Sequence, residues 1–158
     1  PVPTPKNITP GATPLVMTDG QGAEVVKGVE TGGDLLEDYT LRKVGDVSQY
    51  RGGVVLLRDE MNDPRVDGRV TFAFSIDAYD VAASEWGTMK VENTAGSWDG
   101  PCTGGAWSEG EGIAWSCWLT GSGAYDGYTY YKQSTKEVPE KFLDIIGVVY
   151  PGEPPKDR

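Results

Sequence analysis

Histidine is absent from the 158 residues of this chain. Its absence excludes Ser-His-Asp and Cys-His catalysis, together with every metal site that uses an imidazole ligand. Only two cysteines are present, too few to build a structural zinc site by themselves. Since no other motif implies a bound group, we predict no metal site and no cofactor.

Long apolar runs are also missing, and basic residues are few. No segment approaches the roughly 18 to 20 apolar residues of a transmembrane helix, so we expect no membrane span. Acidic residues number 24 against 14 basic ones, which gives a formal net charge of −10. This charge repels phosphate backbones and anionic membranes, and nucleic acid is therefore not an expected partner.

Glycine and proline, by contrast, are abundant, with 22 and 11 residues. Residues 1–14 are rich in proline and poor in apolar side chains, which predicts an extended N-terminal arm. Residues 151–158 form a second polar, Pro-rich tail. The arm is either a mobile linker or a segment that docks on a partner subunit, and the second alternative would make the protein a homo-oligomer.

The stretch between the arms, residues 15–150, has the pattern of one all-β domain. Short runs of β-branched and aromatic residues are separated by glycine turns. In the clearest run, residues 65–77, four apolar residues alternate with small or polar ones and therefore share the core face. Strands are expected at 15–17, 23–30, 50–61, 65–77, 85–92, 97–106, 112–120, 125–134 and 142–150, while 35–44 fits either an irregular strand or a helical turn. This spacing predicts an antiparallel barrel of about eight strands, a sandwich being the alternative.

A Gly-x-aromatic-Asp-Gly pattern occurs twice, at Gly96–Gly100 and at Gly123–Gly127. The separation suits a strand, a hairpin turn and a second strand. Asp-Gly pairs favour turns, because Asp bonds nearby backbone groups and Gly adopts positive φ. We therefore predict two equivalent bends of the sheet rather than catalytic aspartates.

The two cysteines are predicted to form a disulfide. Cys102 and Cys117 are symmetric about a turn between Glu109 and Gly110, so they should face each other across two antiparallel strands. A disulfide implies an oxidising compartment, and we expect a secreted or extracytoplasmic protein. The alternative is two free buried thiols in a cytosolic protein.

Aromatic residues and one acidic segment are the remaining signals. Trp115 and Trp118 are three positions apart, so on a strand they face opposite sides and one of them lies outside the core. Trp118 and Tyr131 are candidates for an interaction patch, with sugar stacking as one use of such a surface. The acidic residues 59–68 favour a solvated turn over a calcium site, because their spacing does not match an EF-hand loop.

Three stretches resemble the allene oxide cyclase and dirigent group: residues 120–131 (TGSGAYDGYTYY), 86–93 (WGTMKVEN) and 145–150 (IIGVVY). Residues 63–66 (DPRV) resemble a turn in uncharacterised small secreted bacterial proteins. The first resemblance implies an eight-stranded antiparallel barrel with an apolar cavity. That group includes enzymes that guide a cyclisation by shaping a reactive substrate. No catalytic residue of the group matches a position here, so the catalytic residues are unknown.

We expect a secreted or cell-surface barrel that binds a small apolar ligand or serves as a scaffold. The candidate cavity residues are Phe72, Phe74, Ile76, Met89, Trp115 and Tyr130. One alternative is a cyclase-like or isomerase-like enzyme, which needs a polar group such as Tyr130, Asp77 or Glu92 among the apolar walls. Another is an extracellular structural protein that self-assembles through its terminal arm.

Overall fold

The computed structural model describes residues 22–107, 112–137 and 143–156. The predicted N-terminal arm and the expected strand at 15–17 lie outside these residues. Nine strands and no helix make up the described part, so it contains no helix that could cross a membrane. The strands are β1 (Glu24–Glu37), β2 (Thr40–Val44), β3 (Val47–Met61), β4 (Gly68–Ala78), β5 (Ala82–Glu92), β6 (Gly96–Trp107), β7 (Gly112–Gly123), β8 (Tyr128–Glu137) and β9 (Leu143–Pro151).

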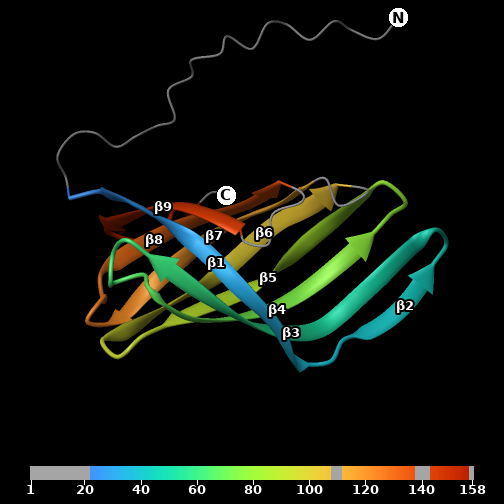
Figure 1. Cartoon of the computed structure of the whole chain (residues 1–158), viewed down its shortest axis with the longest axis horizontal. Coiled ribbons are helices and arrows are strands. Elements are labelled where there is room, and N and C mark those ends of the chain that lie inside the picture. Colours follow the sequence, from blue (N-terminus) through green and yellow to red (C-terminus); the bar gives the residue numbers. More distant parts are fainter. Residues whose placement is uncertain (1–21, 108–111, 138–142, 157–158) are drawn as a thin grey trace, which may run out of the picture.

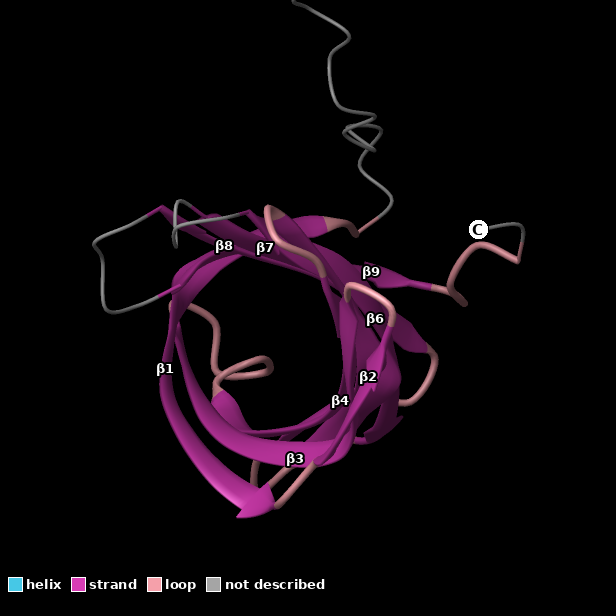
Figure 2. Cartoon of the chain, turned by 90° about the vertical axis from the view of Figure 1, so that its right-hand side faces the viewer, coloured by secondary structure: helices cyan, strands magenta, loops and turns pink. Residues whose placement is uncertain are grey.

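Eight of the strands close into a ring, which confirms the predicted antiparallel barrel. From β3 to β9 each strand pairs with the next, and β1 joins β9 to β3. All these pairings are antiparallel. The strand β2 pairs with β3 and forms a hairpin at one end of the ring (Figures 1 and 2). Closure leaves the ring strands without unpaired edges.

The strand boundaries differ from the predicted ones at several ends. Residues 35–44 hold the end of β1 and the whole of β2, so the helical-turn alternative is wrong. Residues 65–67 and 125–127 belong to turns rather than to strands. Pro151 ends β9 instead of beginning the C-terminal tail. The missed extension of β1 contains Gly32 and Gly33, whose positive φ values mark an irregular stretch beside a register shift.

The predicted disulfide joins β6 to β7 inside the barrel. Cys102 and Cys117 are direct register partners, with their Cα atoms 4.1 Å apart. Both are buried in the core cluster. Their pairing about a central turn therefore gave the correct register of the two strands. A disulfide forms and persists in an oxidising environment, which favours a location outside the cytoplasm.

The two copies of the glycine repeat are not equivalent bends, and this prediction is wrong. Gly96–Gly100 lies within strand β6, whereas Gly123 ends β7 and the following residues form the β7–β8 turn. The copies nevertheless meet, since Gly96 and Gly123 are register partners. Trp98 and Tyr125, the aromatic residues of the two copies, stack with ring centroids 4.9 Å apart and planes 8° apart. The repeat thus builds one end of the core.

Candidate functional site inside the barrel

One end of the barrel is sealed by buried aromatic rings and a turn, and we call it the closed end. Trp98 is buried there, and its Nε1 donates a hydrogen bond to the carbonyl oxygen of Arg65 at 2.7 Å. The Tyr125 hydroxyl donates to Oδ1 of Asn93 at 2.7 Å. Val66, in the β3–β4 turn, has no exposed surface. Side chains and turns together exclude water from this end.

The opposite end is accessible, and we call it the open end. Inward-facing residues become partly exposed as each strand approaches it: on β4, Phe72 is buried, whereas Phe74 and Ile76 are half-buried. On β5, Met89 is buried and Glu85 is half-buried. Figure 2 views the ring from this side, which also carries the β2 hairpin. Phe74, Ile76 and Glu85 are therefore accessible from this end.

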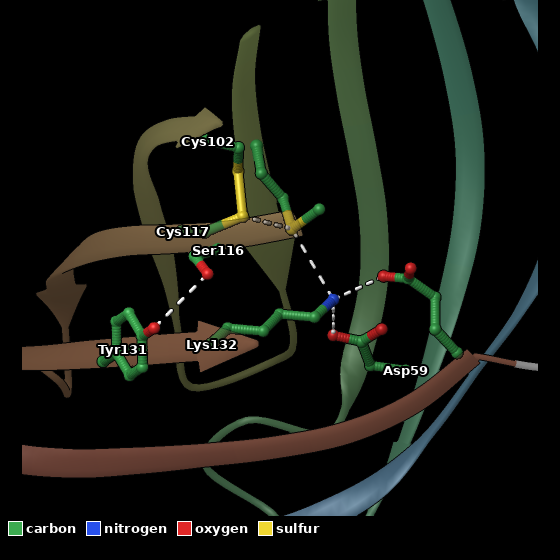
Figure 3. The surroundings of a disulfide bond; sticks show 8 residues. Asp59, Cys102, Ser116, Cys117, Tyr131 and Lys132 are labelled. Atoms are coloured by element: carbon green, nitrogen blue, oxygen red, sulfur yellow. Dashed lines mark hydrogen bonds and ion pairs between the residues drawn. A yellow bond between two sulfur atoms is a disulfide. The ribbon is translucent and has the colours of Figure 1, made fainter. Parts of the chain in front are cut away.

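Three charged side chains lie inside the barrel without any exposed surface. Lys132 reaches from β8 to Glu30 on β1 and Asp59 on β3, which are register partners of each other. Its Nζ donates to Oε2 of Glu30 and, at 2.7 Å, to Oδ2 of Asp59. The same nitrogen lies 3.6 Å from Sδ of Met89 (Figure 3). We call Glu30, Asp59 and Lys132 the buried ionic cluster.

The cluster has two carboxyl groups for one ammonium, and its protonation reflects this imbalance. Burial raises the pKa of Asp59 to about 7, although the charge of Lys132 opposes the increase. Burial alone would lower the pKa of Lys132, but the charges of Glu30 and Asp59 outweigh that effect and raise it. Lys132 is therefore an ammonium group at neutral pH, while Asp59 exchanges a proton there.

Several buried polar atoms in the same interior have no hydrogen-bond partner. Glu30 and Asp59 each use one carboxylate oxygen for Lys132, which leaves Oε1 and Oδ1 unpartnered. The others in the described part of the chain are Nε1 of Trp115, the hydroxyl of Tyr130 and Oγ of Ser134. All of these atoms belong to inward-facing residues. Because an unpaired buried polar group is costly, such a concentration marks a place for a ligand or ordered water.

Glu85 adds a further carboxyl group nearer to the open end. It lies on the inner face of β5, between Ile76 of β4 and Gly104 of β6. Burial, together with the charge of Glu30, raises the pKa of Glu85 to about 7. Burial also raises the pKa of Tyr130, with Asp59 and Glu30 contributing, so its hydroxyl stays protonated at neutral pH. Glu85 can therefore donate or accept a proton inside the barrel, whereas the Tyr130 hydroxyl can take part in hydrogen bonds only.

A continuous series of aromatic rings runs from the open end to the interior, and we call it the aromatic wall. Tyr50 contacts Tyr39 with ring centroids 5.1 Å apart, and Tyr39 contacts Phe74 at 6.4 Å. Phe74 contacts Phe72 at 6.2 Å, and Phe72 contacts Trp115 at 5.5 Å. Gly53 and Gly87 flank Phe74 on the neighbouring strands, and a Cβ at Gly53 would lie 2.3 Å from its ring. The missing side chain at Gly53 leaves space for the ring of Phe74.

The predicted cavity residues all face the interior, although their role in binding stays a prediction. They are Phe72, Phe74, Ile76, Met89, Trp115 and Tyr130. Asp77 and Glu92 were expected as polar groups among them, and this prediction is wrong. Both lie on the outer face, where Asp77 pairs with Arg51 and Glu92 pairs with Lys90.

Trp118 and Tyr131 lie on the outer face, as the alternation with Trp115 predicts. They are register partners on β7 and β8, and their ring centroids are 4.6 Å apart. The Tyr131 hydroxyl lies 3.3 Å from Oγ of Ser116 on the same face (Figure 3). Both side chains are only partly exposed, and their use as an interaction patch remains a prediction.

Sequence reasoning missed the charged residues of the interior. A signal was present, because Glu30, Asp59 and Lys132 each continue the alternation of an inward-facing row. In β3, for example, Asp59 follows Val55 and Leu57 at intervals of two. A charged residue in an apolar row can either mark the end of a strand or be a buried charge that pairs with another one in the core. Only strand pairing distinguishes the two.

The acidic segment 59–68 does not form a shared oxygen site. Asp59 points into the barrel, Asp63 pairs with Arg65, and Asp67 pairs with Arg58. The guanidinium of Arg65 lowers the pKa of Asp63, so this carboxylate is already well partnered. Within the described residues, no group of three or more acidic or cysteine side chains could hold a metal ion. The solvated turn is the better description of residues 62–67.

Two surface hollows, of about 560 and 460 Å³, are lined by no member of the buried ionic cluster. The first is outside the closed end and is lined by residues such as Arg65 and Asn93. The second lies over β4, β5 and β6, beside Thr71 and Thr88. Neither lining contains any of the unpartnered buried polar atoms. We therefore place the candidate site inside the barrel.

Comparisons with known proteins do not assign the chain to a family. No protein-family model matches the chain, and no curated protein matches it. The resemblance to the allene oxide cyclase and dirigent group therefore rests on the three sequence stretches and remains untested.

Proposed function

We propose that this protein binds a small, largely apolar molecule through the open end of its barrel, and that it works outside the cytoplasm as a secreted or cell-surface protein. The observation that carries the proposal is the concentration of unpartnered buried polar atoms on inward-facing residues. Small-molecule sites typically combine apolar walls with a few convergent polar groups. The aromatic wall supplies the first element, and the polar atoms of Trp115 and Ser134 supply part of the second.

Apolar exposure around the open end supports the same proposal. Large apolar side chains are exposed there on the last part of β1, on β2, in the β4–β5 turn and at the end of β6. They are Leu35, Leu36, Tyr39, Leu41, Val44, Tyr79, Val81 and Trp107. An extended apolar surface of this kind favours contact with an apolar molecule.

Ligand-detected NMR with a set of small apolar and amphiphilic molecules tests the proposal. We expect binders whose signals broaden with the wild-type protein and less with Phe74→Ala, since Phe74 joins the two halves of the aromatic wall. Trp118→Ala is the matched control, because this ring lies on the outer face of the barrel. An internal site would be contradicted if no molecule binds, or if Phe74→Ala and Trp118→Ala weaken binding equally.

A cyclase-like or isomerase-like enzyme is the second candidate function. Two interior carboxyl groups with a pKa of about 7, those of Asp59 and Glu85, favour it, because general acids and bases work best near the ambient pH. Turnover of unsaturated epoxides or polyenes would support this candidate. The rate should depend on pH around 7 and fall in Glu85→Gln. No turnover by a correctly folded wild-type protein across the substrate panel would count against it.

A further inference from the structure

We propose that the molecule bound inside the barrel carries a protonated amine or another organic cation, which lies beside Glu85 and the unpartnered carboxylate oxygens of the buried ionic cluster. This inference rests on the proposed function and specifies its ligand class. It is carried by the balance of charge, the hydrogen-bonding capacity and the aromatic surface of the interior.

The interior has more carboxyl groups than ammonium groups. Glu30, Asp59 and Glu85 face inward in the described part of the chain, and Lys132 neutralises only one of them. Two other lysines of this part fall on inner-face rows by register, but Lys136 is half-buried at the end of β8 and Lys43 is exposed on the β2 hairpin. At least one of these carboxyl groups therefore either holds a proton, as the raised pKa values of Asp59 and Glu85 indicate, or needs a compensating cation. A buried charge without a partner is strongly unfavourable, and a cationic ligand would supply that partner.

Hydrogen-bonding capacity points to a donor on the ligand. Oε1 of Glu30 and Oδ1 of Asp59 can only accept hydrogen bonds when their carboxyl groups are ionised. Lys132 cannot satisfy them, because its ammonium already contacts the other two carboxylate oxygens and Met89. An ammonium group offers up to three donors in a compact volume. Charge-assisted bonds of this type are about twice as strong as neutral ones.

The aromatic wall suits the rest of such a ligand. Its rings run from Tyr39 at the open end to Trp115. Glu85 on β5 and Trp115 on β7 lie on either side of Gly104 of β6. Faces of aromatic rings attract organic cations and also pack against apolar bodies. A Cβ at Gly104 would lie 2.6 Å from Cβ of Trp115, so the missing side chain at Gly104 lets β6 and β7 pack closely beside Trp115. The arrangement fits an amine attached to a compact apolar group.

Isothermal titration with a matched set of probes tests the inference. Phenethylamine is the cationic probe, phenethyl alcohol is the neutral isostere, and phenylacetate is the anionic one. We expect the amine to bind at least about tenfold more tightly than the alcohol, since a charged hydrogen bond exceeds a neutral one by roughly that factor. Phenylacetate should not bind.

Glu85→Gln and Glu92→Gln are the informative variants. Glu85 is half-buried on the inner face of β5, so its amide should fold, whereas Glu92 lies on the outer face of the same strand. We expect amine binding to weaken about tenfold in Glu85→Gln, with no change for phenethyl alcohol and no change in Glu92→Gln. Thermal unfolding of each variant verifies that the barrel is intact.

The outcomes separate this inference from the proposed function. The inference of a cationic ligand fails if the amine and the alcohol bind equally well. It also fails if Glu85→Gln leaves the affinity for the amine unchanged. In both cases the proposal of an internal apolar site is unaffected. If none of the probes binds, and the wider NMR set also yields no binder, then both proposals fail. Tight binding of phenylacetate would likewise exclude the inferred charge preference.

Discussion

The two ends of this barrel are built from the same strands, yet they differ in almost every physical property. At the closed end, Trp98 and Tyr125 stack, and their polar atoms find partners in Arg65 and Asn93. Toward the open end, inward-facing residues are half-buried, and Trp115 and Ser134 keep unpartnered polar atoms. The two ends therefore differ in accessibility and in how far the polar atoms of these residues are paired.

The buried ionic cluster separates these two regions, and breaking it should have the largest effect. Lys132→Met removes the ammonium that contacts Glu30 and Asp59, so that within the described residues two buried carboxyl groups lose their cation. We expect a loss of about 3 to 5 kcal/mol in the free energy of unfolding at pH 7, measured by urea denaturation. Lys90→Met, on the outer face, is the control. A loss no larger than that of the control would show that the cluster is not essential for folding.

A pair of truncations compares the ends directly. Trp98→Ala opens a cavity in a sealed region and should cost about 3 to 5 kcal/mol, as large-to-small core changes do. Phe74→Ala removes a half-buried ring at the open end and should cost about 1 to 2 kcal/mol, since less surface is buried there. Denaturant unfolding measures both. Equal losses would mean that the open end is packed as firmly as the closed one.

The disulfide should matter less than either the cluster or the closed end. Replacing Cys102 and Cys117 together by Ala removes a cross-link between residues 15 positions apart. We expect a loss of about 2 to 3 kcal/mol, because the unfolded chain gains conformational freedom. Thermal and urea unfolding measure this loss, and reduction of the wild type under denaturing conditions provides an independent comparison. An unchanged stability would indicate that core packing alone fixes the β6–β7 register.

The last expected effect is a pH dependence of stability, which involves Asp59 in the buried ionic cluster and Glu85 nearer to the open end. The pKa values of Asp59 and Glu85 are raised to about 7 in the folded state and are near 4 in the unfolded state. Between about pH 4 and 7 the folded protein therefore binds more protons, so its stability should fall as the pH rises. Unfolding midpoints measured across this range test the direction.

Glu85→Gln should flatten that pH profile. The amide cannot titrate, so only the contribution of Asp59 would remain. Glu92→Gln, on the outer face, should reproduce the wild-type profile. If stability instead increases from pH 5 to 7 in the wild type, the interior carboxyl groups are better solvated than their burial implies.

Much of the fold could be predicted because local pattern and strand pairing agree. The alternation of Val70, Phe72, Phe74 and Ile76 predicted the inner face of β4, and the cysteine symmetry predicted the β6–β7 register. The glycine repeat was misinterpreted, because a Gly-x-aromatic-Asp-Gly run suits a strand as well as a turn. Its first copy is held in β6 by neighbours on both sides, β5 and β7.

The candidate site was only partly predictable. Its apolar members follow from alternation, and Tyr130 was placed correctly on the inner face. Asp77 and Glu92 were not, because they lie in the rows that face outward. The ionic partners Glu30 and Lys132 are 102 positions apart, and no local pattern indicates which charges meet across a closed barrel.

The amino-acid sequence by itself determined the all-β class, the antiparallel order of the strands and the cysteine pairing. These properties depend on residues that are close in sequence and on a side-chain period of two. Only the tertiary structure decided that β1 joins β3 to β9, that one end is sealed, and that Lys132 lies between two carboxyl groups. Ring closure brings distant strands into contact, and burial then changes the pKa of each charged group that it encloses.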